Sequence, residues 1–207
     1  MAFLSLKKIV PAQFHQDLQL VCGIDEVGRG CWAGPLVACA LIFTKKITIK
    51  GLKDSKQLSP ERREEIFELL QPVCVYGIGM VSNVEIDTLG LTRATTSAYV
   101  RALEQLPFTP SYIVIDGRDR HPLPLPSTTL IKGDEKIKVI ACASIIAKVT
   151  RDRMMMKISE KYPEYGFQEH KGYGTRRHQR ALKKFGVTEI HRKSYKPVQK
   201  VTFMSPY

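Results

Sequence analysis

Residues 21–35 read VCGIDEVGRGCWAGP and join a short apolar run to a glycine-rich turn. The apolar run ends in two adjacent acids, Asp25 and Glu26, and three glycines follow within seven positions, with Arg29 between the first two. These glycines are Gly28, Gly30 and Gly34. Carboxylates at the end of a strand, beside a backbone that glycines leave open, predict a metal site with a phosphate held nearby.

The glycine turn also matches the dinucleotide-binding pattern G-x-G-x-x-G/A at Gly28, Gly30 and Ala33. That site requires a helix whose N-terminus receives the pyrophosphate. Here Pro35 and the strand-like run 36–43 follow instead, and two carboxylates directly before the turn would repel a pyrophosphate that brought no metal. A single bridging phosphate suits this backbone better, and a nucleotide-dependent oxidoreductase stays an alternative.

Apolar runs bounded by turn residues predict strands along most of the chain. The expected strands span residues 20–25, 36–43, 45–51, 73–81, 112–115 and 128–131. The expected helices run from Ser59 to a stop at Pro72, from Ser82 or Asn83 to about Leu106 with a break near Gly90, from Glu135 to about Tyr162, and from Thr175 through Phe185. The first three strands fit an antiparallel meander. Strands that then alternate with helices predict an α/β fold, with helices on both faces of a mixed sheet.

The composition predicts one globular core, since the 207 residues are 43% hydrophobic and 25% charged. We expect a single domain over residues 1–207, with its core at about 15–160 and a basic, substrate-binding helical region at about 161–200. The five cysteines are odd in number and form no C-x-x-C pair, which favours small buried side chains in a reducing cytoplasm. No apolar run has the length of a membrane span, and the N-terminal residues lack the pattern of a signal peptide.

The net charge of +12 is concentrated near the C-terminus. Residues 148–200 contain 15 Lys or Arg and five Asp or Glu, and therefore carry ten of the twelve net positive charges. A basic region behind an acid-bearing N-terminal portion predicts a polyanion that one part holds and the other cuts or reads.

Asp25, Asp116 and Asp134 each end a predicted extended segment, although they lie far apart in the chain. Sites in open sheets form beyond the carboxyl ends of strands, so these acids can converge. Gathered carboxylates repel one another unless a cation lies between them, and oxygen ligands without His or Cys select Mg²⁺ or Mn²⁺. Two such ions about 4 Å apart can activate water and stabilise the leaving oxygen of a phosphodiester. Each acid alone also suits a turn or a helix cap.

Residues 170–178 read HKGYGTRRH and place basic side chains around an aromatic residue and two glycines, which suits a nucleic-acid surface. A zinc site formed by His170, His178 and His191 is an alternative, although the spacing matches no common zinc motif. A solvated basic face is the other alternative.

Seven segments of the chain together resemble the type 2 ribonuclease H family, ribonuclease HII. In chain order they are GIDEVGRG, DSKQLS, VIDG, KGDEK, ASIIAKVTRDR, YGFQEHKGYGT and HRKSY, from about residue 20 to residue 198. The resemblance implies an RNase H-like fold, a five-stranded mixed sheet flanked by helices with a C-terminal helical region. It also implies endonucleolytic cleavage of the RNA strand in RNA–DNA hybrids, and incision on the 5′ side of single ribonucleotides in duplex DNA, leaving 3′-hydroxyl and 5′-phosphate ends.

The resemblance also implies roles for individual residues. The family's catalytic, metal-binding acids correspond to Asp25, Glu26, Asp116 and Asp134, which would hold two Mn²⁺ or Mg²⁺ ions. The family motif that senses the ribose 2′-hydroxyl and the adjacent phosphate corresponds to Gly28, Arg29 and Gly30. The junction-sensing tyrosine corresponds to Tyr173, which would stack on the deoxyribose after the ribonucleotide. We expect Lys56 and Lys171 to bind substrate as well.

Two rival interpretations use the same residues. The sister type 3 ribonuclease H shares the fold and the acids but usually lacks the arginine of the glycine motif and carries an extra N-terminal domain, so Arg29 favours type 2. A non-catalytic hybrid-binding module would be expected to lose acids, and all four are present. Departures from the family pattern occur at Val27, Cys31, Trp32, Gln57 and Tyr195. We expect Trp32 at the rim of the substrate groove, and a monomer as in the family.

Overall fold

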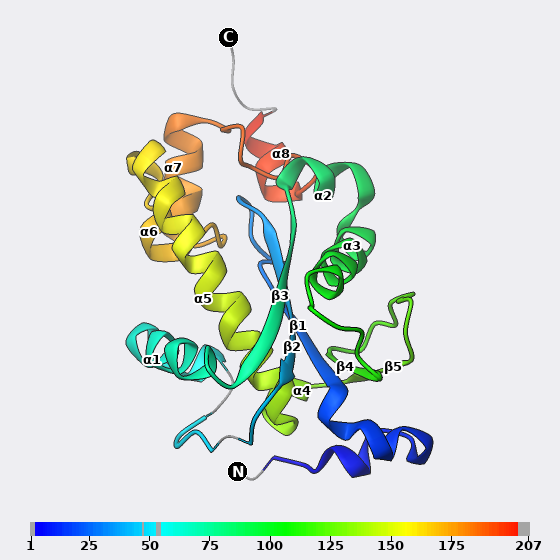
Figure 1. Cartoon of the computed structure of the whole chain (residues 1–207). Helices are drawn as coiled ribbons and strands as arrows, with labels where there is room; N and C mark the ends of the chain where they lie inside the picture. Colours follow the sequence, from blue (N-terminus) through cyan, green and yellow to red (C-terminus); the bar gives the residue numbers. More distant parts are fainter. Residues whose placement is uncertain (1–2, 47, 53–54, 203–207) are drawn as a thin grey trace.

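The computed structural model describes residues 3–46, 48–52 and 55–202. At its centre is a five-stranded sheet in the order β3-β2-β1-β4-β5 (Figure 1). The strands are β1 Val21–Val27, β2 Leu36–Phe43, β3 Cys74–Val81, β4 Tyr112–Asp116 and β5 Ser127–Leu130. Because β1 pairs antiparallel with β2 and parallel with β4, the sheet is mixed, as predicted.

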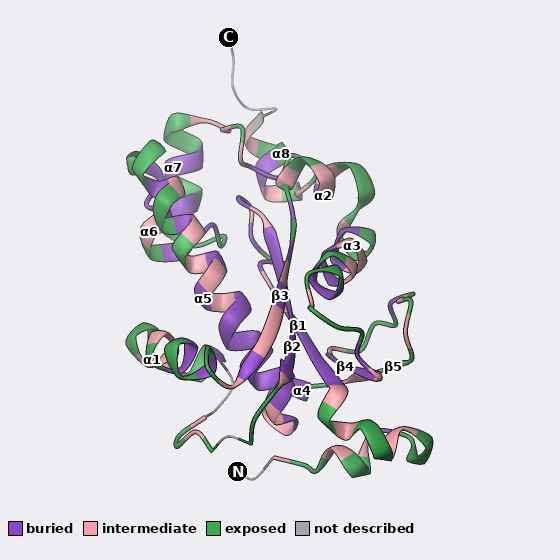
Figure 2. Ribbon diagram, viewed as in Figure 1, coloured by how far each residue is buried: buried purple, intermediate pink, exposed green. Residues whose placement is uncertain are grey.

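Helices cover both faces of the sheet, with α3 on one side and α1 and α5 on the other (Figure 1). The α-helices are α1 Pro60–Leu70, α2 Asn83–Leu89, α3 Leu91–Glu104, α4 Gly133–Lys136, α5 Lys138–Lys161, α6 Phe167–His170, α7 Arg176–Phe185 and α8 Lys196–Thr202. Short 3₁₀ helices span Leu6–Lys8, Ala12–Leu20, Ser55–Gln57 and Pro163–Tyr165. Figure 2 shows the buried residues concentrated in the strands and along α5. The predicted fold class, including the C-terminal helical region, is confirmed.

Local signals set the helix ends as expected. The hydroxyl of Ser59 accepts a hydrogen bond from the first turn of α1, and Ser82 begins α2 with a capping box. Gly90, at φ 75°, separates α2 from α3. Thr175 caps α7, and Gly186, at φ 81°, closes it.

The predicted strand at residues 45–51 is wrong. β2 ends at Phe43, and residues 44–46 and 48–51 form bends, turns and irregular backbone, while Ile47 lies outside the described residues. The third strand of the meander is β3, which pairs with β2 along its whole length. β1 and β3 therefore occupy both edges of β2, and the alternating segment that follows β2 has no strand there to pair with.

Two further boundaries differ from the predictions. The long helix expected from Glu135 is divided into α4 and α5 by Ile137, which has extended backbone angles of φ −121° and ψ 118°. The basic tail from His191, expected to be partly irregular, is irregular over residues 192–195 as predicted and then forms α8, which was not predicted.

Glycines let the helices approach the sheet closely. A Cβ atom at Gly23 of β1 would lie 2.6 Å from the backbone of Val139 in α5. At Gly77 and Gly79 of β3, it would lie 2.1 and 1.8 Å from carbonyl oxygens of α3. The close neighbour expected at Gly77 and Gly79 is thus α3, and α5 approaches β1 equally closely on the other face.

All five cysteines are buried and free, as predicted from their number and spacing. None of the helices in the described part of the chain combines the length and apolarity that a bilayer span needs.

Candidate active site

Three of the predicted acids meet where the parallel strands β1 and β4 end. Asp25 lies on β1, Asp116 ends β4, and Asp134 lies in the first turn of α4. One carboxylate oxygen from each residue lies within 4.8 Å of the others. Asp25 is 5% exposed and Asp134 is 3% exposed. The structure therefore brings these three side chains together over a gap of more than a hundred positions in sequence.

The strand register explains the first pair. Gly23 pairs with Val114 in the parallel register of β1 and β4, so the next pair on the same face is Asp25 with Asp116. The N–H of Gly133 donates a 2.6 Å hydrogen bond to Asp116 Oδ1, which fixes the start of α4 against the end of β4. α4 carries the third acid into the same place.

Glu26 projects to the opposite face from Asp25, because successive residues of a strand alternate. Its carboxylate accepts a hydrogen bond from the phenol of Tyr99 on α3, and its Oε1 lies 3.5 Å from Nη1 of Arg29. It is not one of the three acids whose oxygens lie within 4.8 Å of one another. The four acids predicted to form one metal site are thus a group of three aspartates and a separate Glu26. The Glu26 side chain contacts Arg29 of the glycine turn.

Burial and mutual repulsion disfavour the ionised form of Asp25, and burial disfavours that of Glu26. Burial raises the pKa of Asp25 well above its usual range, and the charges of Glu26 and Asp116 raise it further. Burial also raises the pKa of Glu26, while the hydrogen bond from Tyr99 and the charge of Arg29 partly offset that effect. Carboxylates that raise one another's pKa need a cation among them to be ionised together.

The three aspartates fit a hard divalent cation. Their donors are all carboxylate oxygens, which Mg²⁺ and Mn²⁺ prefer. An ammonium borders the group: Lys56 Nζ lies 3.8 Å from Asp134 Oδ2, and the Lys56 side chain is 79% exposed. A solvated ammonium at that distance balances only part of a negative charge, which leaves the group suited to bind a metal.

Two polar residues of the site had no distinct signal in the sequence. Ser144 of α5 donates a hydrogen bond to Asp25, and its hydroxyl lies 2.8 Å from that of Ser55, the residue before Lys56. Tyr99 of α3 binds Glu26 from the other face. A lone Ser or Tyr within the buried stripe of a helix resembles a core residue, so only the three-dimensional contacts identify them.

The glycine turn, residues 28–34, is held by two segments from the C-terminal part of the chain. Cys31 forms a β-bridge with Tyr173, and Ala33 forms one with His191. The first bridge places Tyr173 beside the turn with 37% of its surface exposed, and burial of its hydroxyl end raises its pKa to about 12. Tyr173 and the glycine turn are thus joined directly through the backbone.

The basic residues predicted to bind substrate differ in placement. Arg29 lies between Glu26 and Asp119, with its Nη2 3.2 Å from Asp119 Oδ2. Lys171 instead folds back: its Nζ donates to the carbonyl of Gln168 and lies 3.1 Å from Met156 Sδ. Lys171 therefore does not point toward the acids in this conformation.

The three histidines considered for zinc are fully engaged within the protein. His191 Nδ1 accepts from the N–H of Thr188, so its Nε2–H donates to Nε2 of His178 at 3.0 Å, and Nδ1–H of His178 donates to the carbonyl of Tyr173 at 3.0 Å. Both ring nitrogens of His170 bond backbone groups. Burial lowers the pKa of His178 to about 4 and that of His191 to about 3. No ring nitrogen of this cluster is left for a metal, and the zinc alternative is wrong for this conformation.

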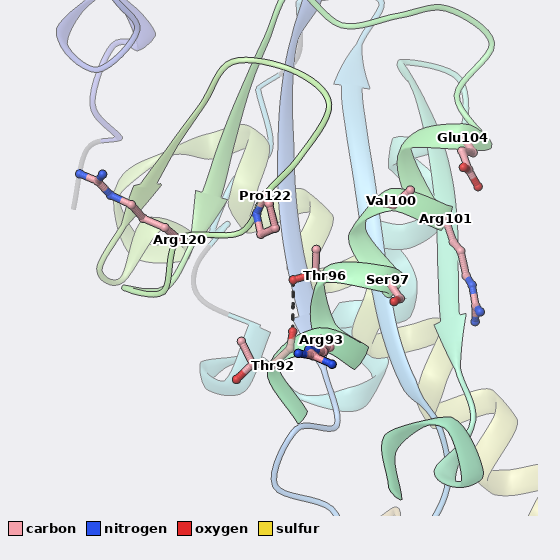
Figure 3. Close-up of a pocket in the computed structure, with 9 residues that line it drawn as sticks. All are labelled: Thr92, Arg93, Thr96, Ser97, Val100, Arg101, Glu104, Arg120 and Pro122. Carbon is pink, nitrogen blue, oxygen red and sulfur yellow. Dashed lines mark hydrogen bonds between the residues drawn. The ribbon is translucent and has the colours of Figure 1, made fainter. Parts of the chain in front are cut away.

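A separate pocket of about 510 Å³ lies along α3 (Figure 3). It is lined by Thr92, Arg93, Thr96, Ser97, Val100, Arg101, Glu104, Arg120 and Pro122. None of these residues was predicted to belong to the site. The acids therefore lie at the strand ends, outside this pocket.

The chain is similar to several known proteins. The family model described as ribonuclease HII matches residues 22–198. The ribonuclease HII of Bacillus thuringiensis (strain Al Hakam) is 46% identical over 198 residues, which cover 95% of this chain and 77% of that protein. The crystal structure of ribonuclease H2 from Pyrococcus horikoshii OT3 matches with a TM-score of 0.73 and 31% identity, over 87% of this chain and 96% of that one.

The structure of a PCNA:RNase HII complex from Archaeoglobus fulgidus matches with a TM-score of 0.74 and 29% identity, over the same shares of the two chains, 87% and 96%. The sheet order, the flanking helices and the C-terminal helices are those of an RNase H-like fold. The chain therefore belongs to the ribonuclease HII family and is a type 2 ribonuclease H.

Proposed function

We propose that this protein is a metal-dependent endonuclease that hydrolyses the RNA strand of RNA–DNA hybrids. We further propose that it incises duplex DNA on the 5′ side of a single ribonucleotide, leaving 3′-hydroxyl and 5′-phosphate ends. The meeting of Asp25, Asp116 and Asp134 beside the glycine turn carries this proposal. Family membership supports the substrate class.

Asp25, Asp116 and Asp134 are the residues that would hold divalent ions, with Glu26 at the edge of the same site. When bound, two Mg²⁺ or Mn²⁺ ions would activate water and neutralise charge at the scissile phosphate. The protein prepares the carboxylates for this role through fixed donors, among them the Gly133 N–H on Asp116. Fixed donors keep the oxygens in place before substrate arrives, which lowers the cost of assembling the site.

Recognition of the ribonucleotide is assigned to the surface next to the acids, formed by Gly28, Arg29, Gly30 and Tyr173. Arg29 contacts Glu26 directly, so a nucleotide at the acids would lie against the turn. The 2′-hydroxyl is the group that distinguishes RNA from DNA, and a glycine backbone can approach it closely. Lys56, which is exposed beside Asp134, is placed for a neighbouring phosphate, whereas Lys171 would have to leave its contact with Gln168 to reach one.

The basic helical region at about 161–200 is proposed to hold the flanking duplex within a single domain. The outer side of α7 carries exposed cations, namely Arg176, Arg180, Lys183 and Lys184. Cations on one helix face bind phosphates without reading sequence. We also propose a monomer that works in the reducing cytoplasm, which the buried free cysteines support.

Product mapping tests the proposal directly. A duplex with one embedded ribonucleotide and a long hybrid are incubated with Mg²⁺, with Mn²⁺ or with EDTA, and product ends are identified. We expect cleavage of both substrates with either metal and none with EDTA, with the cut 5′ of the ribonucleotide. Cleavage of the hybrid alone would contradict the ribonucleotide incision, and absence of cleavage with both metals would reject the nuclease assignment. Full Mn²⁺-dependent activity of Asp134→Asn would remove Asp134 from the site.

A further inference from the structure

Two arginines lead the set of largest fully buried side chains in the described part of the protein. Arg151 of α5 and Arg192, in the segment before α8, are each 0% exposed. Within residues 3–46, 48–52 and 55–202, neither is paired with a carboxylate in a salt bridge. A buried charge without a counter-charge costs stability, so these two guanidinium groups call for a role other than packing.

Arg192 bonds the two ends of the glycine turn. Its Nε and Nη2 donate to the carbonyl of Gly34 at 3.1 and 2.9 Å, and its Nη1 donates to the carbonyl of Arg29 at 3.1 Å. The hydroxyl of Tyr195 donates to the same Arg29 carbonyl at 2.5 Å and also accepts from Arg192. The guanidinium therefore fixes the direction of both peptide groups.

Arg151 joins the turn to the segment that carries Tyr173. Its Nε donates to the carbonyl of Pro35 at 2.8 Å and its Nη2 to that of Ala33 at 3.1 Å. Its Nη1 donates to the carbonyl of Lys171 at 2.8 Å. At Gly28, a Cβ atom would lie 2.5 Å from Arg151 Nε, so the first residue of the turn rests directly on the guanidinium.

The orientation of these carbonyls leaves amide groups available. In the part of the chain that the structure describes, the N–H groups of Arg29 and Gly30 donate to no other backbone or side-chain group. Gly30 is exposed, and nothing lies within 4 Å of the position of a Cβ atom there. Free amides on a turn whose carbonyls are held inward by cations form an arrangement that binds an anion or a hydroxyl.

We propose that Arg151 and Arg192 are positioning residues for substrate recognition: they hold the carbonyls of residues 29–35 inward, so that the amides of Arg29 and Gly30 can bind the ribose hydroxyl and the adjacent phosphate. Arg151 also sets the separation between the turn and Tyr173. This inference rests on the proposed function, because recognition of the ribonucleotide by the turn is itself part of that proposal.

The test uses Arg192→Lys, Arg192→Met and Arg151→Lys, with Arg153→Met as the matched control. Arg153 lies on the same helix as Arg151, but its side chain is 48% exposed and pairs with Glu64. Binding to a fluorescent duplex with one ribonucleotide and to the all-DNA duplex is measured by anisotropy in EDTA. We expect the position-192 variants to bind the ribonucleotide duplex about tenfold more weakly than the wild type. The ratio of their affinities for the ribonucleotide duplex and the all-DNA duplex should approach one. KM should rise while kcat changes little, and Arg153→Met should match the wild type.

The amide resonance of Gly30 in the free protein gives a readout that needs no substrate. It should shift in the position-192 variants and stay in place in Arg153→Met. Where Arg192→Met does not fold, Arg192→Lys decides, since it keeps the charge but cannot bond both carbonyls. A folded variant with an unmoved Gly30 resonance overturns the inference. If the wild-type protein shows no preference for the ribonucleotide duplex, the proposed function fails, and the Gly30 resonance alone then decides the positioning role.

Discussion

Two clusters of titratable side chains in this protein differ in whether their members repel one another. The three histidines near the C-terminus use their ring nitrogens on one another or on backbone groups. The three aspartates at the strand ends also accept hydrogen bonds, from the N–H groups of the residues Glu26, Gly133 and Glu135, but their carboxylate oxygens lie within 4.8 Å of one another as like charges. Both clusters consist of residue types that bind metals, and the chain makes only the second available to a ligand.

The difference shows what marks a site within a folded core. A fully bonded cluster stabilises the protein by itself, and any ligand would have to break existing bonds. A cluster of repelling carboxylates costs stability until a cation binds, and proteins keep such costs where function requires them. Residue type alone therefore does not separate the two, whereas the repulsion among like charges does.

The largest effect is expected from neutralising one carboxylate of the aspartate cluster. Asp25→Asn should lower the cleavage rate by at least about a thousandfold, because one ligand charge is lost from the proposed metal site. The same change should raise the melting temperature of the metal-free protein, because it removes repulsion from a buried group. Steady-state cleavage assays and thermal unfolding in EDTA check both effects. A melting temperature lower than that of the wild type would show that Asp25 is structural.

Acid should weaken the histidine cluster selectively. The folded-state pKa values of His178 and His191, about 4 and about 3, lie below the unfolded value, so the unfolded chain binds more protons as pH falls through that interval. The contribution of each histidine to the free energy of unfolding is therefore fully present above about pH 6.5. It falls by roughly 2 kcal/mol per histidine between about pH 7 and pH 5. His170, stacked on His178 at 4.6 Å, adds to the same trend, because burial lowers its pKa as well.

Urea unfolding at several pH values measures this slope. The double variant His178→Gln, His191→Gln should be less stable at neutral pH and should lose less stability on acidification than the wild type. If the free energy of unfolding fell equally with pH in both proteins, the pH dependence would belong to other groups.

Metal ions should act on one cluster only. Mg²⁺ or Mn²⁺ at a hundredfold excess over its dissociation constant should stabilise the wild type by about 2.7 kcal/mol, since only the folded protein gathers the three aspartates. Thermal unfolding across a metal titration measures this, with Asp116→Asn as the variant expected to lose the response. A wild-type melting temperature that does not respond to either metal would contradict the site.

The smallest expected effect concerns Trp32, which was predicted at the rim of the substrate groove. Its ring packs over Gly174 and lies 5.4 Å from the ring of His178, so it covers the histidine cluster. Trp32→Leu should cost about 1–2 kcal/mol of stability through lost packing and leave kcat nearly unchanged. Urea unfolding measures the stability and cleavage kinetics measure kcat. A changed kcat at unchanged stability would indicate that Trp32 contacts the substrate.

The sequence identified those features that depend on neighbours along the chain. Ser59, Ser82, Gly90 and Thr175 mark helix ends through local hydrogen bonds and backbone angles, and the structure has them there. The convergence of the aspartates also followed from sequence, because strand ends of a parallel pair meet at one edge.

Features that depend on distant parts of the chain, such as strand pairing and burial, could not be predicted from the sequence. The alternation at residues 45–51 suits a strand, yet both edges of β2 are already occupied. The adjacency of Asp25 and Glu26 suggested a common site, whereas strand alternation directs them to opposite faces. Arg151 and Arg192 lie in the basic region predicted to hold a polyanion, and only packing shows that they are fully buried.

The bridges that hold the glycine turn also set the order in which this protein can mature. Residues 28–34 are synthesised well before their partners Tyr173 and His191. Contacts so distant in sequence form late, because the intervening chain must first be closed into a loop. On the ribosome the sheet can begin to assemble while the turn still lacks its partners. The glycine turn should therefore reach its bridged form only after residue 191 has left the ribosome.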